Sequence, residues 1–178
     1  MNLSSNIDLS LFTEVSDKNT LEKLYLLNQD NTPEVGSLES IEDLSNLIEM
    51  SSINFFILDN DEIIGFVICF RENSKYQSLN YKFFCEREDK FIYIDRVVIN
   101  KKYRRKGSGT YLYNHLFNLA KLENIPICCE VNTEPRNEIS LNFHSKNKFK
   151  EVGDHNFNDH SVVSVSYTHL RAHETSQH

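Results

Sequence analysis

A strand, a basic turn with two glycines and a helix follow one another between residues 91 and 123, and this order restricts the fold more than any other feature of the chain. Residues 91–99 are rich in isoleucine, valine and aromatic side chains, which is typical of a strand. Residues 108–123 carry leucines at helical spacing, and residues 126–132 again indicate a strand. This order predicts a βαβ crossover.

The turn between the first strand and the helix is suited to an anion. Five of the six residues in 101–106 are basic, although the formal net charge of the chain is −7. Gly107 and Gly109 let the backbone approach a ligand closely. The first N–H groups of the helix have no partner within it, and the helix dipole favours negative charge there. We therefore expect a phosphate-rich ligand at this turn.

The remaining elements alternate along the chain and predict a mixed α/β fold. Asp17 or Asn19 is placed to cap a helix, and Asp59–Glu62 is expected to form the tip of a hairpin. Residues 71–90 are polar and aromatic together, which indicates a loop with a short helix. Other strands are expected at 7–15, 53–58, 63–70, 149–152 and 161–165, and other helices at 40–50 and 137–147.

Length and composition limit the functional classes. A chain of 178 residues predicts one domain, and its acidic balance argues against a general nucleic-acid binder. No apolar run reaches the ~20 residues of a membrane span, and no signal peptide is visible, so we expect a cytoplasmic protein. The cysteines contain no CxxC pair, which favours reduced thiols and no structural metal: Cys69, Cys85, Cys128 and Cys129.

The end of the chain resembles a translated sequencing adapter. The stretch from Val165 to Thr175 reads VSYTHLRAHET. We therefore assign residues 1–166 to a single domain and 167–178 to a non-native tail, which leaves the native C-terminal sequence open. His169 and His173 have the spacing of two metal ligands on a helix, but the adapter interpretation argues against a metal site there.

The glycine turn matches the pattern [RQ]-x-x-G-x-[GA] through Arg104, Gly107 and Gly109. Neither the P-loop nor the dinucleotide fingerprint is present. In its strand–turn–helix context the pattern resembles the acyl-CoA pyrophosphate loop of the GNAT superfamily of N-acetyltransferases. The stretch from Asn137 to Gly153 is similar to the family's second motif, with His144 and Lys148 where a tyrosine and a glycine are usual. The resemblance covers residues 50–165 and implies a central, largely antiparallel mixed sheet flanked by helices.

The resemblance also implies how acetyl-CoA would be held as a co-substrate, with no metal. The strand backbone at Val97, Val98 and Ile99 would pair with pantetheine. The loop amides from Arg105 to Thr110 would hold the pyrophosphate, and basic side chains would add charge. The implied cofactor-binding set, which also contains the Asn that opens the second motif, is Val97, Val98, Ile99, Arg104, Arg105, Lys106, Gly107, Ser108, Gly109, Thr110 and Asn137.

Three residues are candidates for proton transfer. Strand alternation would put Tyr93, Asp95, Val97 and Ile99 on one face, where Asp95 interrupts an apolar strand. Asp95 could act as the base or could instead form an internal ion pair. Glu130 in the next strand is the other candidate base, so the choice of base stays open. His144 could protonate the leaving thiolate, since histidine titrates near neutrality, or could be a surface residue without a role.

These features predict an acyl-CoA-dependent N-acetyltransferase that moves an acetyl group to a primary amine by direct attack. The acceptor, a small molecule or a protein amine, cannot be chosen from the sequence, and a homodimer is left open. The alternative is a catalytically silent module of the same fold that senses acyl-CoA. A basic patch for nucleic acid or an anionic membrane fits the overall charge poorly.

Overall fold

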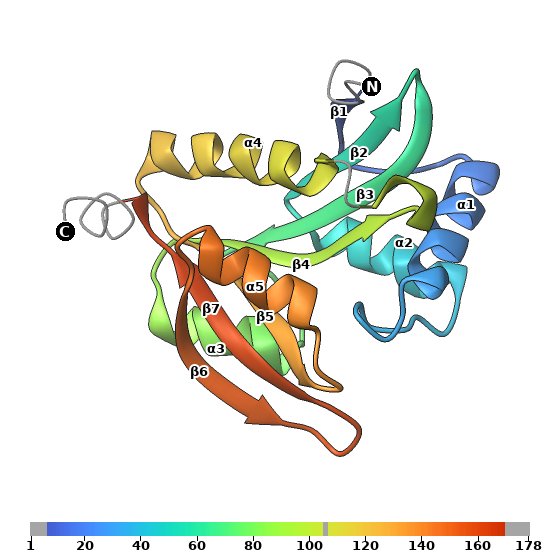
Figure 1. Cartoon of the computed structure of the whole chain (residues 1–178). Helices are drawn as coiled ribbons and strands as arrows, with labels where there is room; N and C mark the ends of the chain where they lie inside the picture. The colour runs from blue at the N-terminus through green and yellow to red at the C-terminus, as the bar shows by residue number, and fades with distance from the viewer. Residues whose placement is uncertain (1–6, 105–106, 170–178) are drawn as a thin grey trace.

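One seven-stranded sheet organises the molecule in the computed structural model, which describes residues 7–104 and 107–169 (Figure 1). Its strand order is β1-β2-β3-β4-β5-β7-β6. Neighbouring strands are antiparallel except β4 and β5, which are parallel and joined by a helix. The strands are β1 (Ile7–Phe12), β2 (Ile53–Asp59), β3 (Glu62–Arg71), β4 (Ile92–Ile99), β5 (Ile127–Glu134), β6 (Lys150–Asn156) and β7 (Ser161–Tyr167).

Helices cover both faces of the sheet, and this confirms the predicted fold class (Figure 1). Helices α4 and α5 pack on one face, and α1, α2 and α3 pack on the other. Asp17 and Ser40 accept hydrogen bonds from backbone N–H groups at the starts of α1 and α2, as helix capping requires. The helices are α1 (Lys18–Asp30), α2 (Ile41–Met50), α3 (Leu79–Arg87), α4 (Ser108–Glu123) and α5 (Glu138–Lys146), with a short 3₁₀ turn η2 (Lys101–Tyr103).

A β-bulge in β4 changes which side chains share a face. Ile68 pairs with Arg96 while the adjacent Cys69 pairs with Ile94, so Asp95 is an extra residue without a partner on β3. Tyr93 and Val98 belong to the core under α1–α3, and Asp95 and Arg96 also make their contacts on that side. Val97 and Ile99 pack on the opposite core. The predicted common face for Tyr93, Asp95, Val97 and Ile99 is therefore wrong, because simple alternation does not survive a bulge.

The parallel strands β4 and β5 part soon after they begin. Their paired residues are Ile92 with Ile127 and Tyr93 with Cys128. Asp95 and Glu130 each follow two residues after the last pair, so the two candidate bases stand opposite each other where the strands separate. The predicted βαβ crossover thus places both carboxylates at one opening in the sheet.

Strand β7 continues through Tyr167, which the sequence analysis assigned to the tail. Tyr167 pairs with Ile127, and its ring stacks on Phe117 with centroids 4.4 Å apart. Residues 170–178, and with them His173, lie outside the described part of the chain. Within the described residues the four cysteines are free thiols, and no helix is long and apolar enough to cross a membrane.

Candidate active site

The glycine turn at the start of α4 has the geometry of an anion site. Gly107 has a φ of +86°, in the left-handed region that side chains other than glycine rarely adopt, and no atom lies within 4 Å of a Cβ built there. In the described chain no side chain caps this end of the helix. The backbone N–H groups of the first turn are therefore available to a ligand.

A groove of about 490 Å³ runs from this turn toward α5 and contains most of the predicted cofactor-binding residues. It brings together residues from β4, α4 and α5 that are distant in the sequence. The predicted residues that line it are Val97, Ile99, Arg104, Gly107, Gly109, Thr110, Asn137 and His144, and the walls also include Asn31, Glu34, Tyr113, Ile139, Ser140 and Phe143.

The predicted cofactor-binding residues differ in how they can contribute, since some line the groove with their side chains already bonded and others do not line it. The Val98 side chain is buried in the opposite core, so only its backbone could contribute. Ser108 is 3% exposed, and its hydroxyl has no hydrogen-bond partner among the described residues. Arg104 donates to the Asn31 side chain at 2.6 Å, and Asn137 caps α5 by accepting from the Ser140 N–H at 3.2 Å. Arg105 and Lys106 lie outside the described residues.

His144 is buried in the groove and is paired with a tyrosine that the sequence analysis missed. Its Nδ1 lies 2.7 Å from the Ser140 carbonyl, and its Nε2 lies 2.7 Å from the Tyr113 hydroxyl. A carbonyl only accepts, so Nδ1 carries the proton, and in the neutral ring Nε2 accepts from Tyr113. Burial lowers the pKa of His144 and raises the pKa of Tyr113 well above its usual value.

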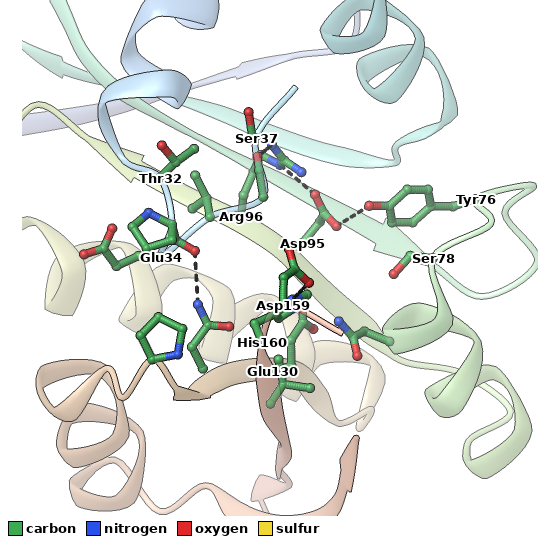
Figure 2. Close-up of a pocket in the computed structure, with 17 residues that line it drawn as sticks. Thr32, Glu34, Ser37, Tyr76, Ser78, Asp95, Arg96, Glu130, Asp159 and His160 are labelled. Atoms are coloured by element: carbon green, nitrogen blue, oxygen red, sulfur yellow. Dashed lines mark hydrogen bonds and ion pairs between the residues drawn. The ribbon is translucent and has the colours of Figure 1, made fainter. Parts of the chain in front are cut away.

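A second cavity, of about 440 Å³, lies on the other side of the parting strands (Figure 2). The loop between α1 and α2, the segment before α3, the middle of β4 and β5 and the β6–β7 hairpin contribute to it. Its lining includes Glu34, Tyr76, Asp95, Arg96, Glu130, Asn132, Asp159 and His160.

Both oxygens of the Asp95 carboxylate are already engaged (Figure 2). Tyr76 donates to Oδ1 at 2.7 Å and Arg96 donates to Oδ2 at 2.7 Å. The Asp95 and Arg96 side chains are 4% and 7% exposed. Arg96 also donates to Asn28 in α1 at 2.6 Å and to the Gly36 carbonyl at 3.1 Å. Asp95 therefore forms the internal ion pair that the sequence analysis gave as the alternative to a role as the base.

Glu130 has the electrostatic properties of a proton acceptor. Burial, and next the nearby charge of Asp95, raise its pKa to about 8. The Tyr93 hydroxyl, which donates to Oε2 at 2.5 Å, and Arg96 act in the opposite direction. A carboxylate with a pKa near neutrality is suited to general base catalysis.

The sequence left Tyr113, Tyr93 and Arg96 without a role. In helical and strand patterns, tyrosine resembles an ordinary core residue, and Arg96 follows the bulge that no pattern revealed. The loop tyrosine Tyr76 lines the second cavity. Among the described residues no group of three or more His, Cys, Asp or Glu is arranged to hold a metal ion.

A model of a protein family described as the acetyltransferase (GNAT) family matches residues 21–149, which is more than half of the chain. The chain belongs to the GNAT acetyltransferase family. The family resemblance found in the sequence is therefore confirmed. No protein with a curated description matches this acetyltransferase by sequence.

Solved structures share the fold of this acetyltransferase. An aminoglycoside acetyltransferase in complex with coenzyme A has a TM-score of 0.70 and 20% identity, over 96% of this chain and 99% of that one. Naa50 of Arabidopsis thaliana, in complex with the bisubstrate analogue CoA-Ac-MVNAL, has a TM-score of 0.65 and 22% identity, over 91% and 98% of the chains. Ard1 of Thermoplasma volcanium has a TM-score of 0.67 and 15% identity, over 92% and 97%.

Proposed function

We propose that this acetyltransferase moves an acetyl group from acetyl-CoA directly to a primary amine. The observation that carries the proposal is the pair of cavities: a groove at an uncapped, glycine-started helix and a cavity with a basic carboxylate share Glu34 as a lining residue. In this proposal one substrate enters from each side of the sheet, and the two react beside the place where β4 and β5 separate.

The groove offers what acetyl-CoA requires. The N–H groups at the start of α4 and the left-handed Gly107 suit the pyrophosphate, and the unpartnered Ser108 hydroxyl lies beside them. Val97 and Ile99 provide an apolar wall. Because β5 leaves β4 after Tyr93, the exposed β4 backbone can pair with the pantetheine amides as an added strand would.

Glu130 serves as the general base in this mechanism. It takes a proton from the acceptor ammonium, and the amine lone pair then attacks the thioester carbonyl. When the tetrahedral intermediate collapses, the C–S bond breaks and its electron pair goes to sulfur, which takes a proton to become the thiol. The nitrogen, which carries a positive charge after the attack, releases its second proton to solvent as the neutral amide forms. Asp95 acts as a positioning residue, because its ion pair with Arg96 fixes the bulge opposite Glu130.

Tyr113 is the group that we assign to the leaving thiolate, with His144 as its positioning residue. A protonated His144 would serve only at acidic pH, whereas Glu130 acts as a base near and above a pH of about 8. Because burial lowers the pKa of His144 and raises that of Glu130, few molecules would hold a protonated His144 and an ionised Glu130 at the same pH. The phenol of Tyr113 keeps its proton throughout this range.

The pH dependence of turnover tests the role of Glu130. With saturating acetyl-CoA and amine, we expect kcat to rise about tenfold per pH unit and to level off near a pH of about 8, because the base works only when it has lost its proton. Glu130→Gln should lower kcat by ~10²–10⁴-fold and remove this rising limb.

The control is Glu86→Gln, which neutralises an exposed carboxylate on α3 outside both cavities and should leave the profile unchanged. Calorimetry should show that Glu130→Gln still binds coenzyme A. Coenzyme A binding without acetylation of any amine by the parent protein would reject the enzyme in favour of the acyl-CoA sensor.

A further inference from the structure

The acceptor cavity contains more carboxylates than proton transfer requires. Four carboxylates line it, from Glu34, Asp95, Glu130 and Asp159, against one guanidinium, that of Arg96. That guanidinium is already committed to Asp95, Asn28 and Gly36. Asp95 and Arg96 neutralise each other, and the pKa of about 8 leaves Glu130 largely protonated at neutral pH. The charge that favours a cation beyond the reacting ammonium is therefore that of Glu34 and Asp159.

The carboxylates are separated between the interior and the mouth of the cavity. Asp95 and Glu130 stand on the sheet where the strands part. Glu34 is exposed on the loop between α1 and α2, and Asp159 is 87% exposed on the β6–β7 hairpin. His160, beside Asp159 in the cavity lining, lies 2.7 Å from that carboxylate and lowers its pKa. A ligand with two separated positive groups can bind an interior carboxylate and a mouth carboxylate at the same time.

The cavity is bounded in a way that suits a small molecule. The Asn132 side chain on β5 donates to the Pro33 carbonyl at 3.1 Å, and this hydrogen bond connects the wall formed by β5 to the α1–α2 loop. Pro135 adds a further rigid wall. The volume of about 440 Å³ falls in the range of roughly 300–1,000 Å³ that is usual for small-molecule sites.

The walls of the cavity are partly apolar. Val35, Val162 and the ring of Tyr76 line it together with the prolines, and polar side chains such as Ser78, Asn80 and Asn132 complete the lining. The apolar side chains can contact the methylene groups that separate two amines in a diamine.

We propose that the acceptor is a small di- or polyamine, with one amine at Glu130 and a second, protonated amine held at the mouth by Glu34 and Asp159. This inference rests on the proposed N-acetyltransferase activity and names its substrate class. Each mouth carboxylate is exposed, so we expect it to strengthen binding of the second amine by about threefold, and both by about tenfold.

Competition between matched amines tests the proposal. Acetylation of putrescine and spermidine is compared with that of butylamine, of γ-aminobutyrate and of a short peptide with a free N-terminus. We expect kcat/KM for the two polyamines to exceed that for butylamine by at least tenfold, and γ-aminobutyrate to be the poorest small acceptor. The double variant Glu34→Gln/Asp159→Asn should lower the putrescine-to-butylamine ratio by about tenfold, mainly through KM.

Glu86→Gln is the charge-matched control, and it should leave this ratio unchanged. If butylamine is acetylated as efficiently as putrescine, the enzyme is an N-acetyltransferase but the inference on its acceptor is wrong. Preference for the peptide also overturns the inference and points to a protein N-terminus. Failure to acetylate any amine, with coenzyme A bound, would reject the proposed function itself.

Discussion

At the scale of single residues, the hydrogen bond from Tyr113 to His144 in the groove beside α4 assigns separate tasks to two side chains in the proposed mechanism. The imidazole stands where the family motif usually has a tyrosine, and the phenol comes from α4 instead. Ser140 fixes the tautomer of His144, so the unprotonated Nε2 faces Tyr113. The proton available for the thiolate is then that of the phenol.

Replacement of Tyr113 by Phe tests this division. We expect Tyr113→Phe to lower kcat by ~10²-fold, because the thiolate loses its proton donor, with coenzyme A affinity nearly unchanged. His144→Gln, whose amide oxygen can still accept from the phenol, should keep much of the rate. Stopped-flow or steady-state assays of thiol release measure both variants. Parental turnover by Tyr113→Phe from about pH 6 to 9 would mean that the thiolate leaves without help from Tyr113.

At the scale of elements, the turn before α4 combines a backbone requirement with a ligand requirement. Gly107→Val is expected to weaken coenzyme A binding at least tenfold, ~1.4 kcal/mol, because a branched side chain is strained at a φ of +86° and stands beside the pyrophosphate site. Gly107→Asn separates the two effects, since asparagine tolerates left-handed dihedrals. Calorimetric titration of coenzyme A is the measurement. Unchanged affinity in Gly107→Val would remove this turn from the site.

Elements were predictable from the sequence where short-range patterns specify them. Each predicted helix and strand has a counterpart, because leucine spacing, caps such as Ser40 and turn residues such as Asn60 act locally. The bulge at Asp95 was not predictable, because it depends on the register with β3. The contact between Tyr113 and His144 joins residues 31 positions apart on two helices. It depends on how α4 and α5 pack, so the sequence alone could not predict it.

At the scale of the whole molecule, a buried ion pair connects the sheet to its helical layer. Arg96 reaches from β4 to Asn28 in α1, while Tyr76 before α3 holds the other oxygen of Asp95. Such a pair contributes little net stability compared with apolar packing, but breaking it leaves a buried charge alone.

Two properties of the whole molecule, a cytoplasmic location and a homodimer, stay predictions.

Removal of one partner of the Asp95–Arg96 ion pair should therefore lower the free energy of unfolding. We expect Arg96→Met to lower the free energy of unfolding by about 3–5 kcal/mol, because Asp95 loses its counter-charge while buried. The double variant Asp95→Asn/Arg96→Met should cost less than the sum of the two single changes. Arg136→Met, which breaks an exposed pair with Glu138, is the control and should cost less than about 1 kcal/mol. Urea unfolding followed by circular dichroism gives these values. Equal losses in Arg96→Met and Arg136→Met would contradict the argument.

The early separation of β4 and β5 also has a consequence for cooperativity. The sheet consists of two antiparallel blocks, one of β1, β2, β3 and β4 and one of β5, β7 and β6. The short parallel pairing of β4 with β5 is the seam that joins them. Antiparallel neighbours such as β2–β3 and β6–β7 are close in sequence and can form early, whereas the seam must wait for α4 to cross over. Pantetheine bound there would form backbone hydrogen bonds that β5 does not make with β4. Binding of the substrate would then stabilise the junction between the two blocks, and the free energies of the two processes would be linked.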